Sequence, residues 1–345
     1  MINEFPLRNK KIILFCPKFF GYEKEIVSVL KKMGAEVTSR SGQASEHPWS
    51  KAFIRLLPRL AWYYTDQLHF SWLKKFSPDN CDLVLIVKGE GLSPKFLKAL
   101  RIHYPKAYIV LYLFDSILNC KYIELKYPYI DEFFSFDPDD CNQMPMFKYR
   151  PLFFIEKYLE TDSGQQNQRL FFLGTLNGDR PKLICRLLAV LNHDVVFDYW
   201  LFVRSRLEFV LRKIFDHSVT ILDSSRFLFN VIPSETIISH LDKCVAVLDI
   251  EHPKQTGLTM RTFEVLASRK KLITTNKTIL QHDFYNPKRI CVIDRNNPSI
   301  PPDFLISKVP PLPDDFMTKY SLSGWLMEIL NTFMMIKTVE DSKGS

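Results

Sequence analysis

Short apolar runs recur along the first half of the chain, and each one ends in polar residues. Runs such as KIILFC, DLVLIV and AYIVLYLF are continuously apolar after their first residue and do not alternate with polar positions. Such runs are typical of strands that lie inside a parallel sheet with both faces covered. The predicted strands are residues 11–16, 35–38, 82–87, 107–114 and 131–136, with helices at residues 22–33 and 94–101.

The alternation restarts after a segment from about residue 149 to residue 168, which we interpret as a linker. Its last part, TDSGQQNQ at residues 161–168, is polar throughout. The second half has strand candidates at residues 169–173, 195–199, 218–222, 244–250, 272–275 and 290–293. Its predicted helices are residues 181–191, a helix capped by Ser234 that runs to Asp242, and an amphipathic helix at residues 320–336. This order predicts an α/β protein with two Rossmann-like, doubly wound parallel sheets.

The predicted domains are residues 1–155 and 169–318, and residues 319–345 are a C-terminal helix that packs back on the first domain, followed by a tail. The 46 basic and 38 acidic side chains give a net charge of +8, which favours an anionic partner. The chain has no basic arm and no finger, homeodomain or RRM signature, so we expect no nucleic-acid partner.

Cysteine usage and hydropathy bear on the compartment. The seven cysteines are odd in number, form no CxxC motif, and several lie inside apolar runs. We therefore expect reduced, buried thiols in a cytoplasmic protein. The first eleven residues are too polar for a signal peptide, and no stretch reaches 18 uncharged apolar residues.

The loops at the strand ends are the places to look for a ligand, because open α/β sheets bind ligands beyond the carboxyl ends of their strands. Gly89-Glu90-Gly91 lacks the third glycine of a dinucleotide fingerprint, and no P-loop, zinc-protease motif or nucleophile elbow occurs. Residues 174–180 (GTLNGDR) offer small residues for a close backbone approach and Arg180 to pair with phosphate. An ordinary turn with an exposed arginine explains this loop equally well.

A second polar loop opens a helix at residues 255–264 (QTGLTMRTFE). Thr256 and Thr259 supply hydroxyls at the helix start, Arg261 lies one turn in, and Glu264 is flanked by apolar residues. The structural alternative is a solvated glutamate that favours the helix dipole. Further carboxylates end strands of the first half, namely Glu90, Asp115 and Asp137. For Asp137 the alternative is helix capping.

The order of these features resembles bacterial GT-B glycosyltransferases, in particular proteins of capsule and lipopolysaccharide gene clusters and the spore-maturation CgeB-like group. The stretches that carry the resemblance are FFGYEKEI, LYLFDS, FFSFDPDD, FFLGTLNGDR and LDIEHPKQTGLTMRTFEVLASRKKLITTN. The resemblance implies two Rossmann-like domains that face each other across a cleft. The C-terminal domain would bind the nucleotide sugar, and the N-terminal domain would bind the acceptor.

Retaining members of this group carry two glutamates eight residues apart, and the second one bonds the nucleotide ribose. Glu264 matches the second position, whereas Thr256 stands at the first, which leaves retaining and inverting chemistry both open. Arg261 or Arg180 would neutralise the diphosphate. The donor-binding residues implied in this way are Gly174, Thr175, Arg180, Gln255, Thr256, Gly257, Leu258, Thr259, Arg261 and Glu264.

The resemblance also implies a mechanism. Helix N-terminal amides and an arginine would stabilise the departing nucleoside diphosphate, so we expect no metal and no obligatory cofactor besides the nucleotide-sugar donor, for which UDP is a guess. An inverting enzyme would need a base on the acceptor side, for which Asp115 is the first candidate and Glu90 the second. The expected acceptor is a growing surface polysaccharide or a lipid-linked glycan.

Two segments, residues 49–75 and 201–215, mix basic with aromatic or aliphatic side chains. Such amphipathic segments lie on anionic membrane surfaces, which would place the protein peripherally on the cytoplasmic face of the inner membrane. Half-buried helices with a solvated basic face are the structural alternative.

Several other functions compete with this prediction. Asp137-Pro138-Asp139 is a DxD sequence, which in a GT-A transferase would bind a metal. A GT-B sugar-nucleotide epimerase would turn over the donor without an acceptor. A catalytically weak nucleotide-sugar-binding or assembly protein would fit the threonine at residue 256. A NAD-binding protein lacks support, because the glycine fingerprint is absent.

Overall fold

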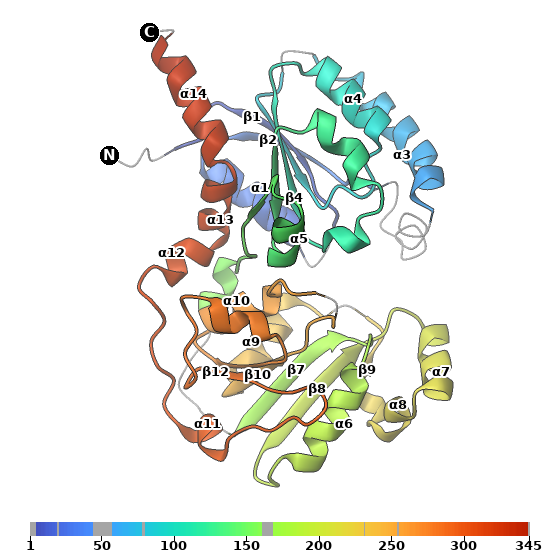
Figure 1. Cartoon of the computed structure of the whole chain (residues 1–345), viewed down its shortest axis with the longest axis vertical. Coiled ribbons are helices and arrows are strands. Elements are labelled where there is room, and N and C mark those ends of the chain that lie inside the picture. The colour runs from blue at the N-terminus through green and yellow to red at the C-terminus, as the bar shows by residue number, and fades with distance from the viewer. Residues whose placement is uncertain are drawn as a thin grey trace. The chain divides into compact units, whose positions relative to one another are not determined.

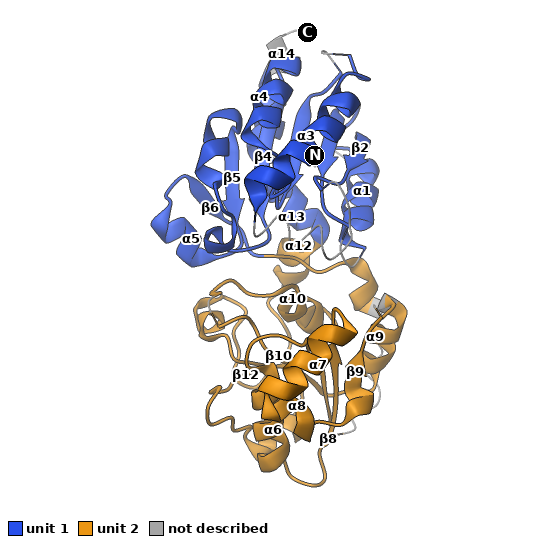
Figure 2. Cartoon of the chain, turned by 90° about the vertical axis from the view of Figure 1, so that its right-hand side faces the viewer, with its two compact units in different colours: residues 1–151, 322–345 blue, residues 152–321 orange. Residues whose placement is uncertain are grey.

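The computed structural model of the chain describes residues 5–18, 21–43, 57–77, 80–160, 168–230, 232–253 and 255–343. The chain forms two compact units, which Figure 2 shows in different colours. Unit 1 comprises residues 1–151 and 322–345, and unit 2 comprises residues 152–321. Residues 161–167 of the predicted linker, residues 49–56 of the first basic segment, and Phe19 and Phe20 of the FFGYEKEI stretch lie outside the described residues.

Unit 1 is built on a parallel sheet with the strand order β2-β1-β3-β4-β5-β6 (Figure 1). Its strands are β1 (Lys11–Phe15), β2 (Glu36–Arg40), β3 (Leu83–Val87), β4 (Tyr108–Leu113), β5 (Glu132–Ser135) and β6 (Phe147–Tyr149). All five residues of β3 are buried, as expected for a central strand covered on both faces. The uniformly apolar sequence LVLIV therefore follows from its place in the sheet.

Helices cover both faces of this sheet. The helices of unit 1 are α1 (Tyr22–Lys32), α3 (Pro58–Leu73), α4 (Pro94–His103), α5 (Pro138–Gln143), α13 (Leu322–Ile329) and α14 (Asn331–Lys343), with 3-10 turns η1 (Ile117–Asn119) and η2 (Ile123–Tyr129). Helix α3 packs against α4, and α1 packs against α13. The start of α4 is set by Ser93, whose side chain accepts a hydrogen bond from the Phe96 amide, and by the proline that follows it.

Unit 2 has a second parallel sheet with the order β12-β11-β10-β7-β8-β9. Its strands are β7 (Arg169–Thr175), β8 (Val196–Phe202), β9 (Phe227–Leu228), β10 (Ala246–Asp249), β11 (Lys271–Thr274) and β12 (Ile290–Val292). Its helices are α6 (Arg180–Val190), α7 (Arg206–Phe215), α8 (His217–Ile221), α9 (Ser234–Asp242), α10 (Met260–Ala267), α11 (Pro302–Ile306) and α12 (Phe316–Tyr320), with 3-10 turns η3 (Glu156–Glu160), η4 (Ser224–Arg226) and η5 (Lys277–Gln281). The strand β10 pairs with β7 on one side and β11 on the other, so the loops after these strands share one sheet edge.

Three local predictions were wrong. The predicted strand at residues 218–222 is wrong, because residues 218–221 lie in helix α8, which Asp216 caps by accepting a hydrogen bond from the Ser218 amide. The edge position of the sheet is taken by β9, which follows later in the chain. The predicted final helix breaks at Ser321, whose backbone is extended between α12 and α13. Helix α9 begins at the expected place, but its N-cap is Pro233 and not Ser234.

The last helices belong to unit 1, where Trp325 of α13 packs edge-on against Tyr112 of β4 with ring centroids 4.7 Å apart. None of the described helices is both long and apolar enough to cross a membrane.

Candidate functional site

The start of helix α10 is fixed by a carboxylate at the end of strand β10. Thr259 is the N-cap of α10, and its hydroxyl donates to Asp249 Oδ2 at 2.6 Å. The hydroxyl of Thr262, one turn into the helix, donates to the same oxygen at 2.9 Å. Asp249 is itself 6% exposed. The helix start is therefore held at the carboxyl end of the sheet, where the amides of the first helical turn form a ready site for an anion.

The loop that precedes α10 is held by the residues after strand β11. The Asn276 side-chain amide donates to the carbonyl oxygens of Thr256 and Gly257 at 3.1 and 3.2 Å, and the Thr278 hydroxyl donates to the Thr256 carbonyl at 2.6 Å. Leu258 is buried and anchors the loop in the core. Because these three hydrogen bonds and the burial of Leu258 hold the segment, its backbone needs little ordering to receive a ligand.

Glu264 is buried on helix α10, with 1% of its surface exposed. Its Oε2 lies 2.9 Å from Arg261 Nη1. The phenol of Tyr158 is close to both side chains: burial raises the pKa of Tyr158, and the negative charge of Glu264 raises it further. The alternative of a solvated first-turn glutamate is therefore wrong. A buried carboxylate of this kind is stabilised only by such partners.

Arg180 forms hydrogen bonds at the carboxyl ends of both β7 and β10. Its Nε and Nη2 donate to the Ile250 carbonyl at 3.0 and 2.7 Å, and its Nη1 donates to the Thr175 carbonyl at 3.0 Å. Burial lowers the pKa of Arg180. The sequence offered two alternatives for Arg180, pairing with phosphate and an exposed position in an ordinary turn. In the structure its donors instead face the backbone carbonyls of Thr175, which ends β7, and Ile250, which follows β10. The other arginine considered for the diphosphate, Arg261, lies on helix α10 beside Glu264.

The 174–180 loop has specific glycine requirements. A Cβ atom at Gly174 would lie 2.6 Å from the Phe172 ring, and Gly178 has φ +56°, which favours glycine.

The side chain of Gln255, at the start of the loop before α10, donates to the Gly257 carbonyl at 3.4 Å. The structure thus brings Gly174, Thr175 and Arg180 to the same sheet edge as residues 255–259, through the pairing of β7 with β10.

A second ionic cluster at this edge was missed by sequence reasoning. Arg295, which follows β12, lies 2.8 Å from Asp179 and 2.7 Å from Glu251 Oε1. Glu251 also accepts a hydrogen bond from the Thr275 hydroxyl. The sequence contained a sign of this cluster. Asp249 and Glu251 end the apolar run CVAVLDIE, just as Glu90, Asp115 and Asp137 end strands of the first half.

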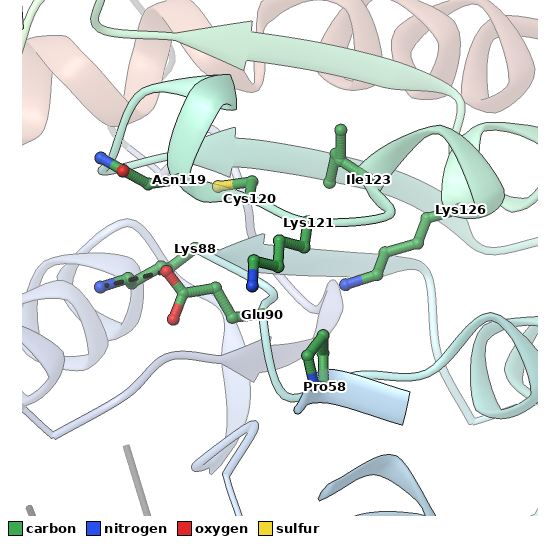
Figure 3. A pocket seen from close by; sticks show the side chains of 8 residues that line it. All are labelled: Pro58, Lys88, Glu90, Asn119, Cys120, Lys121, Ile123 and Lys126. Atoms are coloured by element: carbon green, nitrogen blue, oxygen red, sulfur yellow. Dashed lines mark ion pairs between the residues drawn. The ribbon is translucent and has the colours of Figure 1, made fainter. Parts of the chain in front are cut away.

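In unit 1 the two predicted catalytic carboxylates meet around one lysine, Lys88. Lys88 Nζ lies 3.4 Å from Glu90 Oε1, an ion pair that Figure 3 marks with a dashed line. The same nitrogen lies 3.8 Å from Asp115 Oδ2. The carboxylates follow β3 and β4, which are adjacent parallel strands. The Glu90 side chain is 9% exposed, and its Oε1 has no hydrogen-bond partner among the described residues. Asp115 accepts a hydrogen bond from Asn119 at 2.8 Å.

The loop that carries Glu90 is tightly constrained. Lys88 and Gly89 both have positive φ angles, 73° and 66°. A Cβ atom at Gly91 would lie 2.0 Å from the Gly42 carbonyl oxygen, so only glycine fits there. The Trp62 indole donates to the Glu90 carbonyl at 3.0 Å. These constraints fix the backbone that carries the Glu90 side chain.

The DxD sequence has a structural role, as the capping alternative predicted. Asp137 caps α5 by accepting a hydrogen bond from the Asp139 amide at 3.1 Å. Asp140 accepts hydrogen bonds from the Ser116 and Ser135 hydroxyls. No group of three or more His, Cys, Asp or Glu residues that could hold a metal ion was found among the described residues.

Comparisons with known proteins define the fold. No protein-family model matches the sequence, and no curated protein matches it. Among solved structures, HepE from Anabaena, crystallised with UDP and glucose, is 13% identical with a TM-score of 0.54, and the match covers 98% of this chain and 100% of that one. HepE crystallised with UDP-glucose has a TM-score of 0.53 at 12% identity, covering 97% and 100%.

A glycosyltransferase from Rickettsia africae ESF-5 is also similar. It is 13% identical with a TM-score of 0.51, and the match covers 97% of this chain and 98% of that one. The prediction of a GT-B fold with two Rossmann-like domains is confirmed by these likenesses and by the two six-stranded parallel sheets.

Proposed function

We propose that the chain is a glycosyltransferase that takes a sugar from a nucleotide-sugar donor bound by unit 2 and transfers it to an acceptor bound by unit 1. The observation that carries the proposal is the start of α10. There a polar loop fixed by Asn276 and Thr278 leads into a helix capped by Thr259 and backed by the buried Glu264. In a GT-B fold this is the helix that the family resemblance assigns to the donor.

In this proposal the first turn of α10 holds the diphosphate. Its amides and Arg261 stabilise the negative charge that develops on the leaving oxygen, in the way that fixed donors stabilise an oxyanion. Glu264 orients Arg261 and receives the ribose hydroxyls, while Arg180 acts as a positioning residue that joins the loops after β7 and β10. The HepE complexes with UDP and UDP-glucose support UDP as the nucleotide.

The acceptor hydroxyl needs a base if the reaction inverts the sugar, and the geometry favours Glu90 over Asp115. Glu90 Oε1 has no hydrogen-bond partner among the described residues, whereas Asp115 Oδ1 accepts a hydrogen bond from Asn119. A base must have a lone pair within reach of the proton that it takes. Lys88 holds both carboxylates in place.

The acceptor in this proposal is a lipid-linked or surface glycan, as in the capsule, lipopolysaccharide and CgeB-like proteins that the sequence resembles. Exposed apolar side chains on α7 support a membrane-surface contact, since Leu207, Ile214 and Phe215 are 64, 67 and 83% exposed. Basic residues such as Arg212 and Lys213 lie in the same helix. Helices with this composition bind anionic bilayers, which would place the protein on the cytoplasmic face of the inner membrane.

The second candidate function is a nucleotide-sugar-binding protein without turnover, and the threonine at position 256 favours it. Retaining members have a glutamate side chain at this position, where this chain has a threonine. The structure records hydrogen bonds from Asn276 and Thr278 to the backbone carbonyl of Thr256. Slow hydrolysis of the donor in the absence of acceptor would separate the two functions, because a protein that only binds the donor leaves it intact. Isomerised donor in the same assay would indicate an epimerase.

The proposal is tested by thermal denaturation with UDP, GDP, CMP, dTDP, ADP and NAD. A ligand at one hundred times its dissociation constant stabilises the folded state by roughly 2.7 kcal/mol. For a domain of this size that corresponds to a rise in Tm of about 5 to 10 °C. We expect this rise with one sugar-carrying nucleotide, and a smaller one in Glu264→Gln.

Asp303→Asn, which removes an exposed carboxylate of unit 2, is the matched control and should respond like the wild type. A response to NAD alone, or to no nucleotide, would refute the assignment of the donor site.

A further inference from the structure

Helix α3 of unit 1 has a buried inner face. The inner residues are Ala61, Trp62, Thr65, His69 and Leu73, which are at most 7% exposed. The Trp62 indole, which donates to the Glu90 carbonyl, also packs on the buried ammonium of Lys126, which lies 5.3 Å from the ring centre. These contacts fix the orientation of the helix, so its other face is turned toward solvent.

The outer face of α3 is apolar as well, although it is exposed. Leu57, which directly precedes the helix, and Leu60, Tyr63, Tyr64 and Leu68 within it are between 49 and 69% exposed. Residues 57, 60, 64 and 68 recur at intervals of three and four, so they form one stripe along the helix. A helix that is apolar all round is normally buried on both sides. Among the described residues, however, nothing covers this stripe.

The surroundings of the stripe are basic. Helices α3 and α4 pack against each other, and Figure 1 shows them side by side on the outside of unit 1. Residues 57–77 and 94–103 contain one acidic side chain, Asp66, which is turned toward α4 and accepts a hydrogen bond from Ser93 at 2.5 Å. The same two segments contain six lysines and arginines, namely Arg59, Lys74, Lys75, Lys95, Lys98 and Arg101.

Several of these cations are open to a partner. Lys74, Lys75 and Lys98 are exposed, and none of the three forms an ion pair with a described residue. Two of them, Lys74 and Lys75, directly follow the last turn of α3. The basic side chains therefore lie next to the apolar stripe in the sequence and on the neighbouring helix.

This combination fits the surface of an anionic bilayer. Leucine side chains enter the boundary between headgroups and acyl chains, tyrosine rings prefer the level of the headgroups, and lysines near the surface are attracted to anionic lipids. A second copy of this chain is a poorer occupant, because it would bring the same lysines against each other, and juxtaposed like charges oppose association.

We propose that the outer face of α3 docks unit 1 on an anionic lipid surface. Leu57, Leu60 and Leu68 enter the boundary with the acyl chains, the two tyrosine rings lie among the headgroups, and Lys74 and Lys75 face the lipid phosphates. The assignment deepens the proposed function and rests on it in one respect, because a lipid-linked acceptor for unit 1 would be held in the same surface. It is separate from the contact proposed for α7 of unit 2.

The test is co-sedimentation of the full chain with vesicles, without any nucleotide. The vesicles are pure phosphatidylcholine, or phosphatidylcholine mixed with phosphatidylglycerol, which is anionic. Leu60→Ser/Tyr64→Ser removes two side chains of the outer stripe, and Lys74→Gln/Lys75→Gln removes two of the cations. All four side chains are exposed, so both variants should melt within about 2 °C of the wild type.

Two further variants serve for comparison. Leu188→Ser/Val190→Ser is the matched control, because it removes two apolar side chains of α6 that are 42 and 55% exposed. Leu211→Ser/Phe215→Ser removes two exposed apolar side chains of α7 and measures the contribution of unit 2.

We expect the wild type to bind the anionic vesicles, and to bind them less tightly as the salt concentration rises. Each of the two α3 variants should bind at least about ten-fold more weakly, because it loses apolar area or two surface charges. The α6 control should bind like the wild type. Hydrogen–deuterium exchange in peptides that cover residues 57–73 should become slower with the anionic vesicles.

Four results would overturn the proposal. They are no binding to the anionic vesicles, equal binding to neutral and anionic vesicles, and α3 variants that bind like the wild type, including the case in which only the α7 variant loses binding. The fourth is a dimer in solution that Leu60→Ser/Tyr64→Ser dissociates, since a second copy would then cover the stripe. The rise in Tm with nucleotide is measured separately, so failure of the donor assignment is distinguished from failure of this one.

Discussion

Replacement of Glu264 by alanine should destabilise unit 2 markedly, even without a ligand. The carboxylate is 1% exposed, and its Oε2 lies 2.9 Å from Arg261, whose side chain is 18% exposed. Removing one member of a buried ion pair costs about 3–5 kcal/mol, because the other charge stays buried without its partner. Since Arg261 keeps some contact with solvent, we expect the lower end, about 3 kcal/mol. That corresponds to a fall in Tm of about 6 to 12 °C.

Differential scanning calorimetry of a double-mutant cycle tests this magnitude. Arg261→Met alone should also be destabilising, since it leaves Glu264 buried and without its cation. The double variant should lose less stability than the two single variants together, by about 1–3 kcal/mol, because the pair is removed as a unit. The control Asp303→Asn should stay within about 0.5 kcal/mol of the wild type.

Two results would refute the reasoning. A Glu264→Ala variant that melts within about 2 °C of the wild type would mean that the glutamate is not a buried partner of Arg261. Strictly additive losses in the double variant would mean that the two side chains do not interact.

Three further predictions concern unit 1. Gly91→Ala should lower the free energy of unfolding by more than about 2 kcal/mol in a denaturant titration, because its Cβ would meet the Gly42 carbonyl. Gly42→Ala is the control, since its Cβ would have its nearest contact at 3.6 Å; it should lose less than about 1 kcal/mol, and equal losses in the two variants would contradict the prediction. The free energy of unfolding should fall as the pH drops from 6.5 to about 4, because burial and a neighbouring arginine lower the pKa of His69 to about 4, so the unfolded chain binds the proton first. His69→Asn should reduce this dependence on pH, and an unchanged dependence would exclude His69 as its cause. Glu90→Gln should lower turnover by at least about 100-fold and Asp115→Asn by much less, and equal losses would remove Glu90 as the base.

The sheets could be predicted because their central strands are uniformly apolar, as in β3 and β4, where every position or nearly every position is buried. The error at residues 218–222 has a local cause. The β-branched residues of SVTIL predict a strand. Capping by Asp216 and the packing of Val219 in the hydrophobic core favour a helix instead. Propensity yields to packing and capping in such short segments.

The candidate site was predictable only in part. The polar loop at residues 255–264 could be found because it follows an apolar strand and opens a helix. The partner Tyr158 could not, since it lies far earlier in the chain and contacts Glu264 only through the fold. Burial of Lys126 leaves no sign in the sequence KYIELKYPY, where it is one of two lysines. Arg180 was assigned to a ligand because the sequence cannot show that its donors face backbone carbonyls.

Hydrogen–deuterium exchange with and without UDP tests the central claim most directly, because it reports where the nucleotide binds. We predict slower exchange in peptides that cover residues 255–267, where the helix amides of α10 would face the diphosphate, and in the loop at residues 174–180. Residues 83–91 of unit 1 serve as the internal reference and should not change. Nucleotide binding that leaves residues 255–267 unprotected would contradict the account.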